Sequence, residues 1–478
     1  MAIQTYPQTT IWGWIVQQLL DPTHELLVLA HQIDWEAITD ALRPYYHRLG
    51  RYAKPIRLMV GLHLLKHRLN LSDARVVQGL HENLYWMAFC GIDVGAVLEQ
   101  ATTGKPMRFL DASTMTTWRR RLGPEGTRVL EAVLQQQLVR DKGLDGRCML
   151  TDTTAQEKHV AYPTDTALLD KGRRKLLTLI GQAQATGVAV ARGLRSFRRT
   201  AKRVVLTATK LGKEQLERIQ EANRQLSTMA QHVLHRGPRV LTQLHGKLGA
   251  LRRQGHGRAA MAIERLRTQL EQTAGLVRRV IHQNAERFQG RHVPDKVLSL
   301  HEPHVVSIRR GKRAKSTEYG SKVSLSIDRH GFVITHTEYP CNIADPETLL
   351  DAIAGWREVL GRPPLALGAD RGLHHPGHDR ERLGTAPVAH VSIPPKGKRR
   401  HRDADTAWFK RLQRLRARIE PVIGHLKADH RLDRCRYKGF AGDQLNVSWA
   451  VLAWNTKKWG RVLQQRRLDE SQEASRAA

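Results

Sequence analysis

Three acidic residues occupy positions where they could hold a metal ion. Asp152 follows the largely apolar segment 148–151, and Asp370 follows the apolar segment 365–369. Both segments have the pattern of buried strands, and ligands in open α/β sheets gather at the carboxyl ends of strands. We expect Glu420, the third acid, to come from a helix packed beside that edge. Carboxylates suit Mg²⁺, which assists phosphodiester cleavage, so the set predicts metal-dependent cutting of a polyanion.

Basic residues flank Glu420 at helical spacing. Arg416 precedes it by four residues and Lys427 follows it by seven. At about 100° per residue, all three side chains would lie on one helix face. The spacing of Arg416 and Glu420 is also typical of an ordinary salt bridge on a surface helix. Because Pro421 disfavours helical geometry at the preceding residue, we expect a kink or a helix start at Glu420.

The charge of the chain indicates its partner. The 478 residues include 78 Lys and Arg against 45 Asp and Glu, a formal net charge of +33. Such an excess causes self-repulsion in the compact state and is typical of proteins that bind polyphosphates. Residues 171–290 alone hold 25 Lys and Arg against 6 Asp and Glu, a net charge of +19. Since so few acids cannot pair these bases, the stretch predicts nucleic-acid contact; a solvated helical hairpin is the alternative.

The N-terminal part, residues 1–140, has a helical pattern. Apolar spacing and capping residues predict short helices joined by tight turns. One of these helices carries Arg119, Arg120 and Arg121 near its end. This pattern suits a helix-turn-helix-like DNA-binding domain, although most helical hairpins bind no DNA.

Strand patterns begin at about residue 145. Segments 322–328 and 332–339 alternate between apolar and polar residues around a turn signal at 329–331, which predicts a hairpin. With 147–152, 365–369 and 389–393 they make five strands, and residues 345–360 form a helix between the third and the fourth. This order predicts an α/β fold with a ribonuclease-H-like mixed five-stranded sheet and flanking helices. The expected domains are 1–140 (N-terminal, all-α), 145–170 with 291–465 (split catalytic domain), 171–290 (basic helical insertion) and 466–478 (disordered tail).

Arg416, Glu420 and Lys427 fall in register with the signature Y-x2-R-x3-E-x6-K, with Gln413 at its tyrosine position. At these residues the chain resembles the bacterial insertion-sequence transposases of the DDE type. The resemblance covers about residues 40–180 and 290–460 and leaves the insertion unmatched. Further similar stretches are 151–154 and 368–372 around the aspartates, 429–432 and 438–439 beyond the helix, and 57–62, 71–73 and 83–86 near the N-terminus.

The resemblance implies DNA transposition, by cleavage at the insertion-sequence ends and transfer of the 3′-OH strand into target DNA. It implies that Asp152, Asp370 and Glu420 are catalytic and bind Mg²⁺, with Mn²⁺ as a substitute. It also implies that Arg416 and Lys427 contact transposon-end DNA. The expected partners are the terminal inverted repeats and target DNA, bound in a synaptic complex by a homodimer or higher oligomer.

Other readings stay open from the sequence. His374, His375 and His378 could converge on zinc, although no carboxylate or cysteine partner stands at a standard spacing. Tyr437, in the basic segment 434–438, could be the nucleophile of a metal-free recombinase, but the two strand-end aspartates would then have no role. From a different class, the chain could be a catalytically silent, sequence-specific DNA-binding protein derived from a transposase.

Cysteine usage and hydropathy set the expected location. The four cysteines form no CxxC pair, so the sequence predicts neither a thiolate zinc site nor a disulfide framework. No apolar stretch reaches the roughly 18 residues of a membrane span. We therefore expect a cytoplasmic, nucleoid-associated bacterial protein without membrane contact.

Overall fold

The computed structural model describes residues 20–46, 53–102, 104, 108–141, 144–189, 194–212, 214–309, 317–375, 388–397 and 399–477. The chain divides into two compact units, the first made of residues 1–157 and 321–478 and the second of residues 158–320. Because the second unit is inserted in the sequence of the first, the first unit is assembled from two distant chain segments.

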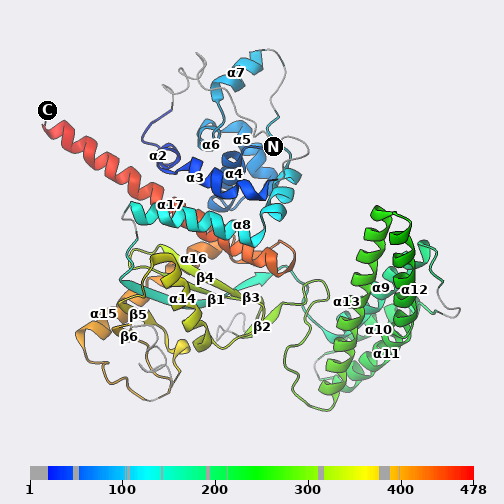
Figure 1. Cartoon of the computed structure of the whole chain (residues 1–478). Coiled ribbons are helices and arrows are strands. Elements are labelled where there is room, and N and C mark those ends of the chain that lie inside the picture. The colour runs from blue at the N-terminus through cyan, green and yellow to red at the C-terminus, as the bar shows by residue number, and fades with distance from the viewer. Residues whose placement is uncertain are drawn as a thin grey trace. The chain divides into compact units, whose positions relative to one another are not determined.

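A mixed sheet lies in the first unit (Figure 1). The strands β3 and β4 form an antiparallel hairpin, β1 lies next to β3, and β5 and β6 continue the sheet in parallel with β1. Strands lie at each of the five predicted segments, but the described sheet has seven, because β2 and β7 add short pairings. The strands are β1 (Cys148–Lys158), β2 (Val306–Arg309), β3 (Thr317–Ile327), β4 (Val333–Tyr339), β5 (Ala366–Ala369), β6 (His390–Ser392) and β7 (Arg434–Cys435).

Three helices hold the carboxyl ends of the strands in place. α14 (Thr348–Leu360) packs against β4, and α15 (Ala407–Arg416) packs against β5 and β6. α16 (Ile419–Ala428) buries Ile419 and Leu426 in a core that also contains Leu150 of β1. The junction of α15 and α16 is therefore held against the strands that carry the two aspartates.

The N-terminal region is helical, as predicted. Asp34 and Ser72 cap α3 and α5, because their side chains accept hydrogen bonds from the backbone N–H groups of Ala37 and Arg75. α8 has a kink at Gly123, whose φ of 64° is left-handed. The helices are α2 (Glu25–Gln32), α3 (Trp35–Leu42), α4 (Ile56–Arg68), α5 (Asp73–Glu82), α6 (Leu84–Phe89), α7 (Val94–Thr102) and α8 (Ala112–Arg140).

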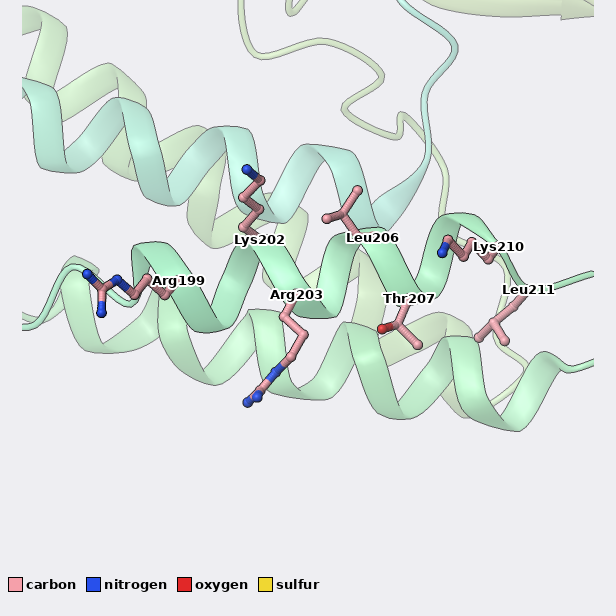
Figure 2. A pocket seen from close by; sticks show the side chains of 7 residues that line it. All are labelled: Arg199, Lys202, Arg203, Leu206, Thr207, Lys210 and Leu211. Carbon is pink, nitrogen blue, oxygen red and sulfur yellow. The ribbon is translucent and has the colours of Figure 1, made fainter.

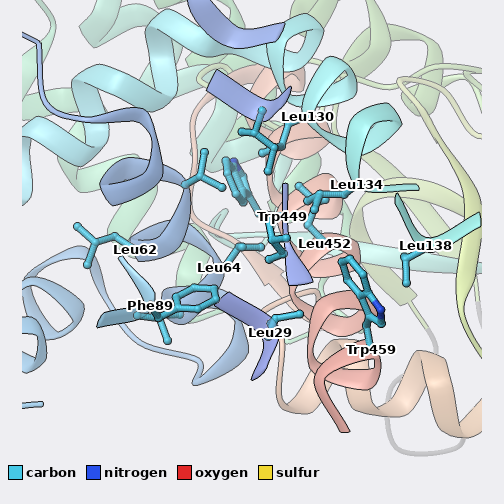
Figure 3. Close-up of a cluster of buried hydrophobic side chains, with 14 of the residues drawn as sticks. Leu29, Leu62, Leu64, Phe89, Leu130, Leu134, Leu138, Trp449, Leu452 and Trp459 are labelled. Carbon is cyan, nitrogen blue, oxygen red and sulfur yellow. The ribbon is translucent and has the colours of Figure 1, made fainter. Parts of the chain in front are cut away.

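The N-terminal helices and the sheet share one hydrophobic core. Leu64 of α4, Leu134 of α8 and Trp449 of α17 (Gly439–Ala477) belong to the same buried cluster, part of which is shown in Figure 3. Met149 of β1 and Leu367 of β5 belong to it too. α17 packs against α2, α4, α8 and β4. The expected boundary near residue 140 therefore does not separate two cores.

The C-terminal end differs from the sequence prediction. Residues 466–477, expected to be a disordered tail, form the last part of α17. Nine of these twelve residues are Arg, Glu, Ala, Leu or Gln, which are helix formers. The Gln465 side chain also donates a hydrogen bond to Asp469 one turn later, at 2.8 Å.

The second unit contains the predicted helical insertion and has cores of its own. Its helices are α9 (Asp165–Ala185), α10 (Arg198–Thr209), α11 (Leu216–Leu234), α12 (Gly237–Arg253) and α13 (Gly257–Phe288). α13 packs along α9 and α12, while α11 packs along α9 and against α10. Buried aliphatic side chains of α9, α12 and α13 gather in one cluster. In this unit β2 pairs antiparallel with the start of β3, with Val306 opposite Gly320.

Candidate active site

The two aspartates come from neighbouring strands of the sheet, but Asp152 is not at a strand end as predicted, because β1 continues beyond it to Lys158. β1 pairs in parallel with β5, and the last residues paired in this register are Thr151 and Ala369. Asp152 and Asp370 directly follow that pair, and both side chains are half-buried. Neighbouring strands are about 4.8 Å apart, so the two aspartates follow backbone positions that are close in space.

The backbone after β5 fixes the carboxyl group of Asp370. This residue caps the short 3₁₀ helix η3 (Arg371–Leu373), where its Oδ1 accepts hydrogen bonds from the N–H of Gly372 at 2.7 Å and of Leu373 at 3.3 Å. A Cβ at position 372 would lie 2.9 Å from the same Oδ1. Glycine therefore permits the close approach that orients the carboxylate at the strand end.

Gln413 ties α15 to the ends of two strands. Its Nε2 donates hydrogen bonds to the backbone oxygen of Ala369 at 3.2 Å and to that of Ser392 at 2.7 Å. The same atom lies 3.0 Å from the Ser392 hydroxyl. Ala369 directly precedes Asp370. Gln413, which stands at the tyrosine position of the signature, thus fixes the end of β5 directly before Asp370.

Glu420 lies at a helix start, as Pro421 predicted. α15 ends at Arg416 and α16 begins at Ile419, so Arg416 and Glu420 belong to two successive helices. Their side chains form an ion pair with a distance of 2.9 Å between Nη2 of Arg416 and Oε1 of Glu420. The Glu420 side chain is 60% exposed. A Cβ built on Gly368 would lie 3.7 Å from the Cβ of Arg416, so this junction lies close to β5.

The carboxylates are only partly assembled. Among the described residues, no group of three or more His, Cys, Asp or Glu side chains is placed to hold a metal ion. Asp152 and Asp370 follow the last pair of the β1–β5 register, whereas Glu420 is paired with Arg416. Two aspartates offer the hard oxygen donors that suit Mg²⁺. Of the three histidines considered for zinc, His378 lies outside the described residues.

The bases predicted to contact DNA differ in exposure. Lys427 is half-buried on α16, and Arg120 and Arg121 are exposed on α8. Arg119 is only 5% exposed and forms an ion pair with Asp73, with 2.9 Å between Nη2 and Oδ2. A guanidinium held in this way does not reach a DNA backbone, so the DNA-binding role predicted for Arg119 is not supported.

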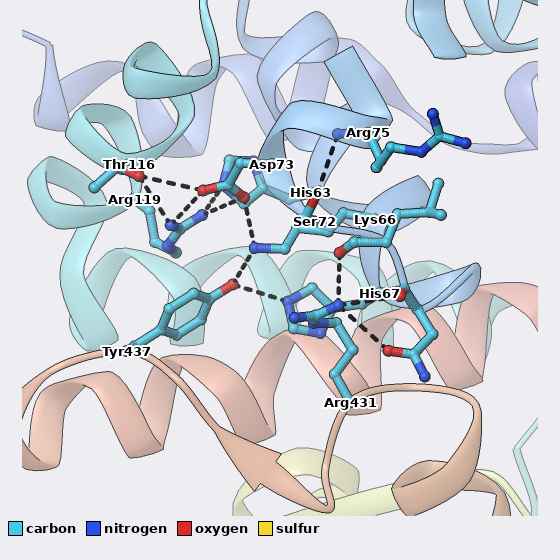
Figure 4. A network of polar contacts seen from close by, with 12 residues as sticks. His63, Lys66, His67, Ser72, Asp73, Arg75, Thr116, Arg119, Arg431 and Tyr437 are labelled. Carbon is cyan, nitrogen blue, oxygen red and sulfur yellow. Dashed lines mark hydrogen bonds and ion pairs between the residues drawn. The ribbon is translucent and has the colours of Figure 1, made fainter. Parts of the chain in front are cut away.

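A buried polar cluster joins the N-terminal helices to the C-terminal segment (Figure 4). Asp73 binds Lys66 as well as Arg119, with 2.5 Å between Oδ1 and Nζ of the lysine. Lys66 also donates to the hydroxyl of Tyr437 at 2.8 Å, and Nε2 of His67 lies 3.1 Å from that hydroxyl. Sequence patterns did not reveal this cluster, because Lys66 and Tyr437 are 371 residues apart.

The cluster has perturbed pKa values. Burial acts to raise the pKa of Asp73, but the hydrogen bonds and charges of Arg119 and Lys66 lower it far below its usual value. Burial, together with repulsion by Arg119, lowers the pKa of Lys66 to about 8. Burial also raises the pKa of Tyr437. A tyrosine that is harder to ionise is poorly suited to be a nucleophile, which argues against the metal-free recombinase reading.

Comparison with known proteins identifies the family. Residues 15–121 match the family described as Transposase domain (DUF772), and residues 295–456 match the family described as Transposase DDE domain. A Rhizobium meliloti protein named "Uncharacterized protein ORF8 in nfe locus" is 38% identical over 195 residues, which cover 40% of this chain and 86% of that protein. No solved structure matches.

The chain belongs to the bacterial insertion-sequence transposases of the DDE type. Membership implies an enzyme of the nuclease and transferase kind, a ribonuclease-H-like fold for the catalytic sheet, DNA as substrate, and a general use of divalent metal ions. The four cysteines all lie in the described part of the chain and form no disulfide bond. Within the described part of the chain, none of the helices has the length and apolar character needed to span a bilayer.

Proposed function

We propose that the protein transposes its insertion sequence by cleaving DNA at the terminal inverted repeats and joining the 3′-OH end to target DNA. The observation that supports this most is the register of β1 and β5, whose last pair, Thr151 and Ala369, directly precedes Asp152 and Asp370. We propose that these carboxylates hold Mg²⁺, or Mn²⁺ as a substitute. The ion would activate the attacking oxygen and stabilise charge on the leaving oxygen.

Glu420 is the proposed third catalytic carboxylate and metal ligand. Its present partner is Arg416, and exposed ion pairs contribute only about 0–1 kcal/mol. A side chain that is 60% exposed and weakly held can turn from Arg416 toward the strand ends at little cost. Arg416 would then be released to bind a DNA phosphate.

The remaining bases are proposed to hold DNA. Arg416 and Lys427 would contact the transposon end, and the exposed Arg120 and Arg121 would contribute from a helix-turn-helix-like domain in residues 1–140. Such phosphate contacts fix position and orientation without reading sequence. We further propose a homodimer or higher oligomer in the synaptic complex, acting in the nucleoid where its DNA substrate lies.

The basic insertion is proposed to bind DNA through α10. Four bases of this segment, with Leu206, Thr207 and Leu211, line a depression of about 430 Å³ (Figure 2). None of the four forms an ion pair with another described residue, and α10 buries only Ala201 and Ala208. Contacts of this kind are sequence-independent and weaken as salt increases. The four bases are Arg199, Lys202, Arg203 and Lys210.

The variant Asp370→Asn tests the catalytic proposal. The substrate is a plasmid that carries the gene with its flanking DNA on both sides, incubated with Mg²⁺. We expect strand cleavage to be lost while DNA binding persists, because the change removes one carboxylate charge and little volume. Asp40→Asn removes the same charge at an exposed site and should cleave normally. Full activity of Asp370→Asn would exclude this aspartate as a ligand.

The same assay addresses the catalytically silent alternative. That alternative draws on the ion pair of Glu420 with Arg416, which keeps the third predicted metal ligand paired with a base. A silent protein would bind the flanked ends and yield no nicks with either Mg²⁺ or Mn²⁺. Metal-dependent nicking at the ends by the unmodified protein would rule it out.

A further inference from the structure

A basic groove lies in the first unit between the start of α5 and the segment that runs from α16 to β7. Its volume is about 700 Å³. Five of its eleven lining residues are basic and one, Asp433, is acidic. A concave surface with this excess of one sign attracts a polyanion. The basic residues are Arg75, Lys427, Arg431, Arg434 and Arg436.

Hydrogen bonds donated from each wall to the other hold the two walls of the groove together. Arg431, at a left-handed φ of 69°, donates from Nη1 to the backbone oxygens of Asn70 at 3.1 Å and Leu71 at 2.7 Å. In return, Nδ2 of Asn70 donates to the backbone oxygen of Ala428 at 3.0 Å. Arg431 is therefore a positioning residue that holds the backbone before α5 against the segment after α16.

Two guanidinium groups on opposite walls are available to a ligand. Arg75 and Arg436 are exposed, and neither forms an ion pair with another described residue. Arg75 lies in the first turn of α5, where backbone N–H groups add partial positive charge. By contrast, Arg434 is paired with Glu157 at 3.3 Å. Arg75 and Arg436 are thus the bases whose charge the protein itself leaves uncompensated.

We propose that this groove holds the phosphate backbone of the transposon-end DNA, so that the N-terminal helices help to grip the strand being cut. The inference rests on the proposed function, because α16 connects the groove to Glu420. Lys427 follows Glu420 by seven residues on α16, about 10 Å at 1.5 Å per residue. A DNA strand advances about 3.4 Å per nucleotide, so the groove meets the strand roughly three phosphates from the cut.

The test is the double variant Arg75→Ala/Arg436→Ala, compared with Arg140→Ala/Arg466→Ala, which removes two exposed arginines outside the groove. The probe is a duplex with the sequence that flanks the gene, and its binding is measured in EDTA over a range of salt concentrations. Each lost phosphate contact lowers the slope of log affinity against log salt by about 0.9, so we expect a fall of about 1.8. Arg75→Lys/Arg436→Lys should restore the slope.

Binding and cleavage separate the two proposals. A slope for Arg75→Ala/Arg436→Ala equal to that of the control pair, with an unchanged melting temperature, would overturn the groove assignment even if cleavage were normal. Conversely, a reduced slope in a protein that never nicks DNA with Mg²⁺ would refute the proposed catalysis and leave the groove as a DNA-binding surface. Because the binding assay contains no free divalent ion, neither result depends on the other.

Discussion

Replacing Arg119 by alanine discriminates between a DNA contact and a structural ion pair. Arg119 binds Asp73, donates from Nη1 to Nε2 of His63 at 3.2 Å, and lies with its guanidinium carbon 4.2 Å from the centre of the Tyr437 ring. Its loss leaves the carboxylate of Asp73, which is 19% exposed, with Lys66 as its remaining cation. Breaking a buried ion pair costs about 3–5 kcal/mol. Because Lys66 stays, we expect a loss near the lower limit, about 3 kcal/mol.

The matched control is the next residue in the same helix. Arg120 is exposed, and surface substitutions of this kind change stability by about 0.5 kcal/mol or less. Since the folded-state pKa of Asp73 is lowered, its stabilising effect is present above the unfolded-state pKa of about 4 and is lost as the pH falls through the folded-state pKa. At pH 7 the full difference between the two variants should therefore be observed.

Urea unfolding and salt-dependent DNA binding together distinguish a structural ion pair of Arg119 from a DNA contact. We expect Arg119→Ala to unfold at a clearly lower urea concentration than the unmodified protein. Under conditions where it is folded, its slope of log DNA affinity against log salt should be unchanged. Arg120→Ala should show the opposite pattern, normal stability with a slope lowered by about 0.9. If Arg119→Ala were as stable as Arg120→Ala and its slope of log DNA affinity against log salt fell by about one, the structural role of the ion pair would be refuted. The DNA contact predicted from the sequence would then be supported.

Two further substitutions test other buried contacts. Burial acts to lower the pKa of His336, but Glu131 at 2.9 Å and Glu338 at 2.7 Å raise it well above its usual value. The protonated imidazole therefore stabilises the fold fully below pH 6.5, the unfolded-state pKa, and this stabilisation is lost as the pH rises through the folded-state pKa. His336→Gln should therefore lower the unfolding free energy by about 3 kcal/mol at pH 6, and by less in alkaline urea titrations, whereas the exposed His330→Gln should not. Gln413→Ala removes the hydrogen bonds that fix the strand end before Asp370, and small misplacements of catalytic groups cost up to about 100-fold in rate. Its cleavage rate should fall by about tenfold or more with unchanged DNA affinity, and a rate equal to that of the exposed Gln465→Ala would contradict the positioning role.

Local patterns predicted much of the fold. The strand segments before Asp152 and Asp370 were found because buried strands are short apolar runs, and the helix start at Glu420 was found because proline restricts the residue before it. Ser72 and Asp34 were recognisable as caps from their type and place. Each of these signals depends on residues that are close in the sequence.

Long-range contacts account for what the sequence did not predict. Arg119 was taken for a DNA contact because it belongs to a run of three arginines, yet its partner Asp73 is 46 residues away. The side-chain direction of Glu420 was also undetermined, since the same spacing serves a surface ion pair and a metal ligand. The shared core could not be inferred either, because Leu64 and Trp449 meet only in the folded chain.

The turn before α5 links stability to DNA binding. On its inner side Asp73 is fixed by Lys66 and Arg119 and, through Lys66, is connected to Tyr437. On its outer side Arg75, two residues later, faces the groove whose opposite wall is the segment just before Tyr437. The buried cluster therefore supports the groove walls, and a change that loosens the cluster should lower the DNA affinity while leaving the salt slope unchanged, because no base is removed from the groove. For this reason, and because they share one core with the sheet, we expect the N-terminal helices to act together with the catalytic sheet rather than as a separable DNA-binding arm.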